Sequence, residues 1–360
     1  MSNELLKTIS GVKIESTETW EKFRRPEIMN LMSEYIYGVR PVERPKDLKF
    51  KTVKSETIEK GILHEIIEIS FSDYSFKVYG YLPEEFSGKV PAFIYVMHEF
   101  EENHCDLDSS IECEYVNIRE IIKRGYAVFI MPTSGIAPDF TAQANYTKGV
   151  YPVFTPDVND RKENSWATIS AWSWGASRVM DYIENDSRID SEKVSVAGHS
   201  RGGKTALWCG ATDTRIMCAI SNNSGCAGAA MHQTKGGEHI KDINRTDWFC
   251  KNYHKFDDNE DMLPTDQHML ISAMAPRLCY VASSSKDDWA DPEAERLSCR
   301  LANEVYELYG KKGVVLPEEP VELDKAYHEG NIGYHVKTGD HSITFADWDM
   351  FLDFIDSKIK

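Results

Sequence analysis

Residues 194–208, VSVAGHSRGGKTALW, contain two overlapping motifs that predict incompatible chemistries. Gly198 to Gly202 form a G-x-S-x-G nucleophile elbow, in which Ser200 is a covalent nucleophile. Gly198 to Thr205 also form a G-x-x-x-x-G-K-T phosphate loop, in which Lys204 and Thr205 bind a nucleotide phosphate and its magnesium ion. Both motifs need a strand, a tight glycine turn and a helix, so the surrounding residues have to decide between them.

The order of the predicted elements favours the elbow. A phosphate loop usually follows the first strand of its sheet, whereas at least two apolar runs typical of buried strands precede residue 194. A nucleotide site also needs a later strand that ends in an aspartate for magnesium. The nearest later runs end in SNNSG and ASSSKDD, and only the second is a weak candidate.

A serine nucleophile needs a histidine base, and the histidine needs an acid that fixes its tautomer. In the hydrolase order the acid follows the serine and the histidine comes last. The segment KDDW supplies Asp287 and Asp288 after the run RLCYVAS, and TGDHS supplies His341 before a predicted final helix. The sequence therefore predicts a triad of Ser200, His341 and one of the two aspartates.

The other histidines and the tryptophan-rich segment fit ordinary structural roles. His98 and His104 are six residues apart, which is not the spacing that puts two imidazoles on one helix face, so we expect no metal site there. His199 lies inside the elbow, where a structural role suffices. Four histidines belong either to a pocket or to the surface of a polar insertion: His232, His239, His254 and His268. Three tryptophans of one predicted helix are expected in the core rather than on a sugar-binding surface: Trp166, Trp172 and Trp174.

The elements that must position these residues form an α/β fold. Three runs with alternating character (LKFKTVKSETI, ILHEIIEISF and SFKVYGYLP) predict an antiparallel hairpin or meander. Five continuous apolar runs (VPAFIYVM, YAVFIM, KVSVAG, RIMCAISNN and PRLCYVAS) alternate with amphipathic helices, which predicts a mostly parallel, doubly wound sheet. We expect one domain over residues 1–360, with a helical extension at 1–45, an insertion at 226–268 near the active site and a loop at 311–330.

Composition and charge exclude several classes of protein. Of the 360 residues, 41% are apolar and 28% charged, which is typical of globular proteins. The net charge of −17 argues against nucleic-acid and anionic-membrane partners. Eight scattered cysteines without a C-x-x-C pair are expected to be free thiols. No signal peptide or membrane span is visible, so we expect a cytoplasmic protein; a processed secreted form would look the same. The oligomeric state is not readable.

With these residues placed, the sequence resembles a known family. GHSRGGKTALW is similar to the elbow of bacterial glucuronoyl esterases, carbohydrate esterase family 15, and of their relatives described as acetylxylan esterases. Further segments match in order over roughly residues 85–358: FEENHC, IIKRGYAVFIM, IAPDF, WSWGASRVMDYIE, NNSGCAGAA, DWFCKNYHKF, LPTDQHMLISAMAPR, DDWADPEAE and KTGDHSITFADW.

The resemblance implies a three-layer α/β-hydrolase sandwich that hydrolyses esters of plant cell-wall carbohydrate, namely 4-O-methyl-glucuronate esters that link xylan to lignin alcohols. It implies Ser200 as nucleophile and His341 as base, with Arg201 stabilising the oxyanion and no cofactor or metal. It implies Lys204, Glu238 and Trp289 as substrate-binding residues. We also expect Trp248 and His268 to bind substrate.

One departure from the family bears on the acid. Many members carry a glutamate in a Q-E-S-G segment after the strand that follows the elbow, and here that position is Asn223. The acid should therefore lie on the next loop, where the D-x-W-A-D-P spacing favours Asp287 over Asp288. The departure leaves two alternatives open: an esterase for O-acetyl groups on xylan or pectin oligosaccharides, and a non-catalytic carbohydrate-binding protein on the same fold.

Overall fold

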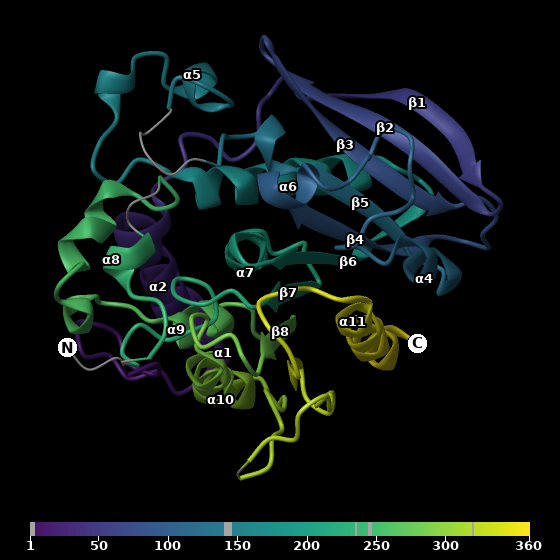
Figure 1. Ribbon diagram of the computed structural model, residues 1–360. Helices are drawn as coiled ribbons and strands as arrows, with labels where there is room; N and C mark the ends of the chain where they lie inside the picture. Colours follow the sequence, from purple (N-terminus) through teal and green to yellow (C-terminus); the bar gives the residue numbers. More distant parts are fainter. Residues whose placement is uncertain (1–3, 140–145, 235, 244–246, 319) are drawn as a thin grey trace.

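One nine-stranded sheet organises the protein (Figure 1). The computed structural model describes residues 4–139, 146–234, 236–243, 247–318 and 320–360. The strands stand in the order β1-β2-β3-β5-β4-β6-β7-β8-β9. Their bounds are β1 Lys49–Glu59, β2 Ile62–Phe71, β3 Tyr74–Pro83, β4 Val90–Met97, β5 Ala127–Pro132, β6 Ile189–His199, β7 Cys218–Asn222, β8 Leu278–Ser284 and β9 Ile332–Lys337.

The sheet has an antiparallel part and a parallel part. Strands β1, β2 and β3 form the expected meander, and β3 pairs antiparallel with β5. From β5 onward every neighbouring pair is parallel. The chain runs outward from β4 to β5 and then crosses back to β6 and on to β9, so the predicted doubly wound, mostly parallel sheet is confirmed.

Helices cover both faces of the sheet. The α-helices are α1 Thr17–Thr19, α2 Arg25–Met32, α3 Glu99–Glu102, α4 Ile118–Lys123, α5 Tyr151–Phe154, α6 Thr168–Ile183, α7 Arg201–Thr212, α8 Ile240–Ile243, α9 Gln267–Ser272, α10 Pro292–Leu308 and α11 Phe345–Ile359. Two π-helical turns, η1 Trp20–Arg24 and η2 Ser33–Tyr37, flank α2. The short 3-10 helices of the described residues are η3 Thr133–Gly135, η4 Val158–Asp160, η5 Lys251–Phe256 and η6 Glu260–Met262.

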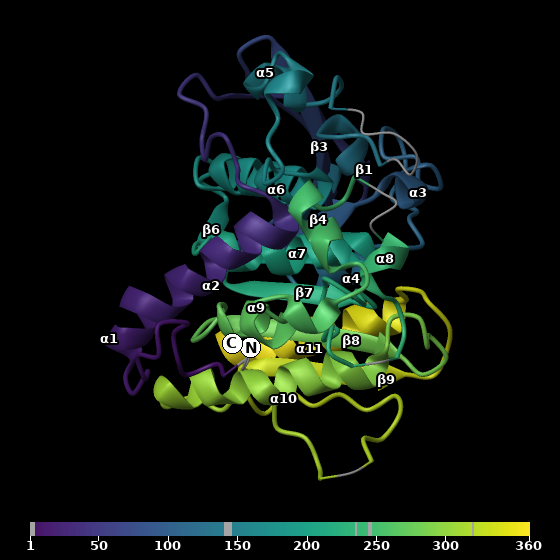
Figure 2. The same ribbon diagram turned by 90° about the vertical axis from the view of Figure 1, so that its left-hand side faces the viewer.

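The two helical layers enclose two separate hydrophobic clusters. Side chains of a strand point alternately to opposite faces, and β4 illustrates this, with Ile94 and Val96 in one cluster and Phe93 and Tyr95 in the other. Helices α6, α7, α9 and α10 pack on the first face, while α4 and α11 pack on the second (Figures 1 and 2). All sixteen residues of α6 are buried, including Trp172 and Trp174, and Trp166, just before the helix, is buried too, so the three tryptophans lie in the core as predicted.

Two segments outside the sheet are a helical run near the N-terminus and a polar stretch between β7 and β8. Residues 17–37 form a nearly continuous helical run, begun by a capping box at Ser16. This run packs on the main domain, where the Arg25 guanidinium donates to the carbonyl oxygens of Ala211 and Ala273. The polar stretch 226–268 lies between β7 and β8 and contains only short helices in its described part. Within the described ranges, no helix has both the length and the apolar character needed to cross a membrane.

The parallel strands deliver the candidate catalytic residues to one edge of the sheet. Ser200 follows β6, Asp287 follows β8, and His341 follows β9. In an open parallel sheet, ligands bind at the carboxyl ends of the strands because the connecting loops meet there. The topology therefore assembles residues that are widely separated in sequence.

Candidate active site

The turn between β6 and α7 holds Ser200 in a strained backbone conformation. Its φ of 55° and ψ of −122° lie outside the regions that a serine normally adopts. The turn is possible only with glycines beside it. A Cβ atom on Gly198 would lie 2.3 Å from the carbonyl carbon of Gly202, and one on Gly202 would lie 2.7 Å from the Val96 oxygen. This geometry is that of a nucleophile elbow, and it stores strain at the reactive residue.

His341 and Asp287 form a hydrogen-bonded pair beside this turn. Nδ1 of His341 lies 2.6 Å from Oδ2 of Asp287. Asp287 is buried, with 5% of its surface exposed, whereas Asp288 is exposed. Burial raises the pKa of the Asp287 carboxyl, but the hydrogen bond and the charge of His341 outweigh it, so that the pKa lies below its usual value. An ionised Asp287 fixes the Nδ1–H tautomer of His341 and leaves Nε2 free to accept a proton.

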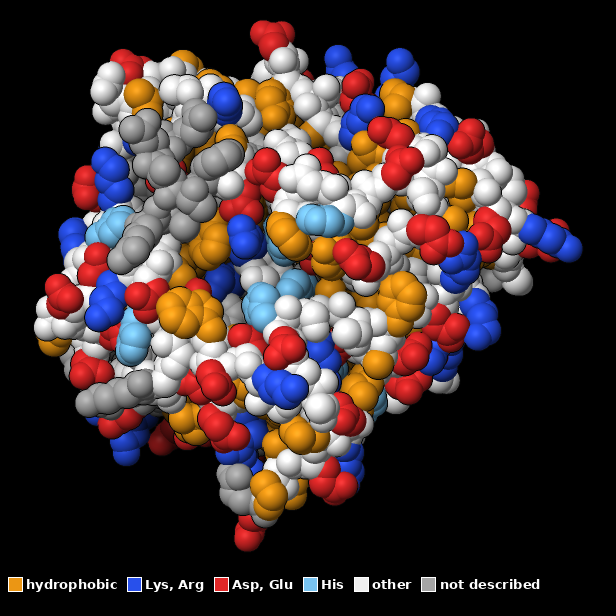
Figure 3. Space-filling model, viewed as in Figure 1, with side chains coloured by type: hydrophobic (Ala, Val, Ile, Leu, Met, Phe, Trp, Pro, Cys, Tyr) orange, Lys and Arg blue, Asp and Glu red, His pale blue; other side chains and the backbone are white. Residues whose placement is uncertain are grey.

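Ser200 and His341 line the same cavity, which has a volume of about 540 Å³. It opens on the face of the molecule shown in Figure 3, where histidine and basic side chains gather in a hollow despite the net negative charge of the chain. Its other lining residues are His98, Phe100, Glu101, Glu114, Tyr115, His199, Arg201, Ser342 and Ile343.

His199 supports the ring of His341. The centroids of the two imidazoles are 4.6 Å apart, and Nδ1 of His199 lies 2.7 Å from Oδ1 of Asn222. Burial, together with the nearby His341, lowers the pKa of His199 to about 3, so this ring is neutral near pH 7. A neutral neighbour does not oppose a positive charge on His341, which a charged one would do.

Arg201 is held beside the nucleophile by Asp139, a carboxylate that no sequence motif marks. Nη1 of Arg201 lies 2.7 Å from Oδ2 of Asp139, and Nε1 of Trp248 donates to the other oxygen of Asp139 at 3.0 Å. The guanidinium carbon also lies 4.9 Å from the Trp248 ring centre. Asp139 and Trp248 therefore orient the Arg201 guanidinium together. The segment IAPDF contains Asp139 but carries no pattern that links this carboxylate to the elbow.

Lys204, Glu238 and Trp289 form a second connected set. Nζ of Lys204 lies 2.9 Å from one oxygen of Glu238, and Nε1 of Trp289 donates to the other at 3.1 Å. Lys204 lies one helical turn after Ser200, and its backbone N–H donates to the Ser200 carbonyl. Trp289 is 56% exposed, unusually high for a tryptophan. The set combines a cation, an anion and an exposed aromatic face, which are groups that bind sugar hydroxyls and sugar rings.

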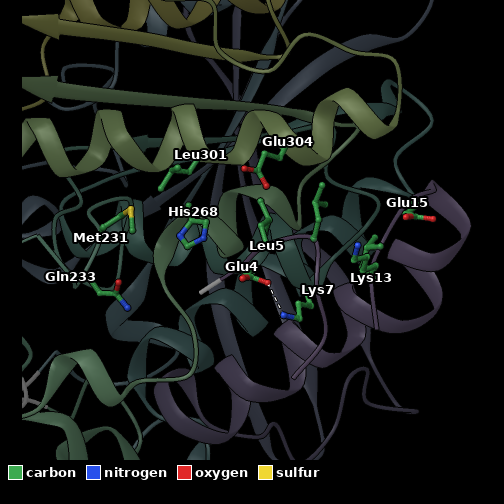
Figure 4. Close-up of a pocket in the computed structure, with 12 residues that line it drawn as sticks. Glu4, Leu5, Lys7, Lys13, Glu15, Met231, Gln233, His268, Leu301 and Glu304 are labelled. Atoms are coloured by element: carbon green, nitrogen blue, oxygen red, sulfur yellow. Dashed lines mark ion pairs between the residues drawn. The ribbon is translucent and has the colours of Figure 1, made fainter. Parts of the chain in front are cut away.

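His268, expected from the sequence to bind substrate, is not among the residues that line the Ser200 cavity. His268 lies in α9 and lines a different cavity of about 830 Å³ together with Leu5, Met231 and Leu301 (Figure 4). The cause is the docking of α9 between α10 and the N-terminal extension. The three other histidines of the insertion also lie outside the residues that line the Ser200 cavity and have acidic partners: His232 with Asp266, His239 with Glu260, and His254 with Asp257.

The loop after β7, where the family glutamate is replaced, is fixed by a buried acid. Asn223 donates through Nδ2 to the Ser284 hydroxyl at 2.8 Å. Glu295 of α10 accepts hydrogen bonds from the backbone N–H groups of Ser224 and Gly225 and, at 2.6 Å, from the Ser283 hydroxyl. Burial raises the pKa of Glu295 to about 7. Glu295 ties the β7 loop to the end of β8, and no sequence motif marked it.

In the described part of the chain, no group of three or more histidine, cysteine, aspartate or glutamate side chains is arranged to hold a metal ion. The acid, base and nucleophile arrangement found here needs no metal to operate.

Comparisons with known proteins agree with this geometry. The sequence profile of a family described as "Glucuronyl esterase, fungi" matches residues 76–310. The chain is 34% identical to a carbohydrate esterase from an unknown prokaryotic organism, over 97% of this chain and 87% of that protein. It is 32% identical to a 4-O-methyl-glucuronoyl methylesterase of Podospora anserina, over 35% of this chain and 29% of that protein.

Among solved structures, the chain is similar to a glucuronoyl esterase from Solibacter usitatus. The TM-score is 0.90 and the identity 31%, with 100% of this chain and 98% of the other covered. The predicted α/β-hydrolase architecture and the predicted resemblance are thus both confirmed. The chain belongs to the glucuronoyl esterases of carbohydrate esterase family 15 and is a serine hydrolase that cleaves carbohydrate esters.

Proposed function

We propose that Ser200, His341 and Asp287 carry out ester hydrolysis through an acyl-enzyme. Ser200 attacks the ester carbonyl carbon while Nε2 of His341 takes the serine proton. His341 then gives this proton to the departing alcohol, and an incoming water repeats the sequence to release the acid. The hydrogen bond of 2.6 Å between His341 and Asp287, beside the strained serine, is the observation that carries this proposal.

Arg201 stabilises the oxyanion of the tetrahedral intermediate. Its backbone N–H lies directly after Ser200 at the N-terminus of α7, where such groups point toward an anion. Its side chain adds a positive charge whose direction is set by Asp139 and Trp248. A preoriented charge reorganises little as the reaction proceeds, which is the source of its catalytic benefit.

The acyl part of the substrate is a glucuronate, and 4-O-methyl-glucuronoyl esters are the substrate class. Two matched proteins are named for glucuronoyl esters, and the set of Lys204, Glu238 and Trp289 fits a sugar next to Ser200. Lys204 donates to ring hydroxyls, Glu238 accepts from them, and the exposed face of Trp289 stacks on the pyranose. The ion pair of buried Lys204 and partly exposed Glu238 binds a polar sugar better than it binds an acetyl group.

The test compares two ester classes on one enzyme preparation. A methyl or benzyl ester of 4-O-methyl-glucuronate is assayed beside an acetylated xylo-oligosaccharide. We expect kcat/KM for the glucuronate ester to exceed that for acetate release by at least about 100-fold. Preferential acetate release would instead support an O-acetyl esterase. Binding of glucuronate without turnover of either ester would identify a non-catalytic carbohydrate-binding protein.

A further inference from the structure

Two cysteines meet in the loop that borders the active-site cavity. The sulfur atoms of Cys105 and Cys113 are 2.6 Å apart. All eight cysteines lie in the described part of the chain, and this is the one pair among them with sulfur atoms in contact. Cys105 is half-buried and so accessible to small molecules, whereas Cys113 is buried. No short spacing of cysteines marks this pair in the sequence, which by itself predicts scattered free thiols.

The two cysteines lie on segments that the fold holds in place. The backbone N–H of Cys105 donates to the carbonyl of Glu102, at the end of α3. Between the cysteines, Tyr81 donates through its hydroxyl to the Ser110 carbonyl at 3.0 Å. Just beyond Cys113, the Tyr115 carbonyl accepts from Nε1 of Trp348 at 2.8 Å. These hydrogen bonds anchor the loop on both sides of the two thiols and so hold them close together.

These segments make one wall of the Ser200 cavity. Phe100 and Glu101, from α3, and Glu114 and Tyr115, directly after Cys113, all line it. Phe100 is 58% exposed and Tyr115 is half-buried, so the wall presents aromatic surface to the cavity. A covalent link between the cysteines would fix the distance between the two halves of this wall.

We propose that Cys105 and Cys113 form a reversible disulfide that cross-links the wall of the active-site cavity. The oxidant is a small-molecule disulfide RS–SR, such as glutathione disulfide. The Cys105 sulfur attacks RS–SR, whose S–S bond breaks, and one RSH leaves. The Cys113 sulfur then attacks the mixed disulfide at Cys105, the protein S–S bond forms, and the second RSH leaves. The two thiol protons end on the two RSH molecules, and two electrons pass from the protein to RS–SR.

The cross-link acts on the wall and not on the catalytic groups. It removes more conformations from the unfolded chain than from the folded one, so the oxidised protein melts about 3–5 °C higher than the reduced one. A preorganised wall also binds the alcohol part of the ester with less ordering cost. For a benzyl ester, KM should fall roughly two- to fivefold at unchanged kcat. This kinetic consequence rests on the proposed function; the cross-link itself does not.

The experiment uses the full-length chain after incubation with glutathione disulfide or with dithiothreitol. After alkylation under denaturing conditions and digestion by trypsin, both cysteines fall in one peptide, residues 90–119. In the oxidised sample we expect this peptide to carry no alkyl group and to be about 2 Da lighter than the unalkylated dithiol peptide, because two hydrogen atoms are lost when the disulfide forms. It should carry two alkyl groups in the reduced sample. The other six cysteines, alkylated in both samples, serve as internal controls.

Variants separate the cross-link from general effects of oxidation. Cys105→Ser and Cys113→Ser should each lose the difference in melting temperature between oxidised and reduced samples. Cys299→Ser, which changes a buried cysteine in α10, should keep it. Two alkyl groups on peptide 90–119 after oxidation would overturn the proposal, as would a persistent melting difference in Cys105→Ser. If the cross-link forms but glucuronate esters are not hydrolysed, the proposed function fails and the cross-link stands.

Discussion

Replacing Asp287 by asparagine tests how the base is held. The substitution keeps the shape of the side chain but removes its charge. In the native site, Oδ2 of Asp287 accepts a hydrogen bond from the Nδ1–H group of His341 at 2.6 Å. An asparagine can present its NH₂ group to Nδ1, which makes Nδ1 the acceptor and puts the proton on Nε2. The nitrogen that should take the Ser200 proton is then already protonated.

The size of the expected loss in kcat follows from the tautomer of His341 and from the burial of Asp287. Only the minor tautomer of His341 in the variant can act as the base, and the imidazolium loses a buried, ionised partner. Such a change in a serine triad lowers kcat by about 10³- to 10⁴-fold. This corresponds to about 4–5.5 kcal/mol of lost transition-state stabilisation. KM should change little, because Asp287 is buried and its side chain contacts His341.

The assay is steady-state hydrolysis of a glucuronate benzyl ester by three proteins. Asp288→Asn is the matched control, since Asp288 is adjacent in sequence but exposed. We expect it to retain at least about half of the native kcat, as exposed positions contribute little. The reasoning would be refuted if Asp287→Asn kept more than a tenth of the native kcat. It would also be refuted if Asp288→Asn were the more damaging change.

Three further predictions follow from the described contacts. Glu295 has its pKa raised to about 7, so its contribution to stability is full below about pH 4.5 and is lost as the pH rises through 7. Glu295→Gln lacks this loss. Its free energy of unfolding relative to that of the native chain, measured in urea titrations, should therefore rise by up to about 3 kcal/mol from pH 5 to pH 8. An equal difference between the two proteins at both pH values would contradict this. Trp289→Ala should raise KM about tenfold at unchanged kcat, because the sugar ring loses its stacking partner. The control is Phe23→Ala, which removes an exposed aromatic side chain from the N-terminal extension and should leave KM unchanged. Gly198→Ala should lower the free energy of unfolding by more than about 3 kcal/mol, because the new Cβ meets the backbone of Gly202 at 2.3 Å; a stable, active variant in urea titrations would show that the turn can relax.

The sequence predicted the features that depend on local pattern. Continuous apolar runs marked the buried parallel strands, and the glycines at 198 and 202 marked the elbow, because each reflects a steric demand within a few residues. The pairing of His341 with an aspartate after β8 was predicted from chain order, since parallel strands bring their following loops to one edge.

Features that depend on contacts between distant segments were not predicted. Asp139 orients Arg201 across 62 positions, and Glu295 holds the β7 loop from α10; neither carboxylate differs in sequence from a surface acid. His268 lies in a segment that matches the family, yet the docking of α9 points it into another cavity. Sequence pattern reports which face of an element is buried, but not which neighbour it meets.

The most direct test of the account is to identify the residue that forms the covalent intermediate. The protein is treated with a fluorophosphonate, which reacts with activated serines, and is then digested with trypsin. We predict a single phosphonylated peptide, residues 194–201, modified on Ser200, and loss of both labelling and ester turnover in Ser200→Ala. Labelling of a different serine, or retained turnover in Ser200→Ala, would contradict the central claim that the strained serine after β6 is the nucleophile.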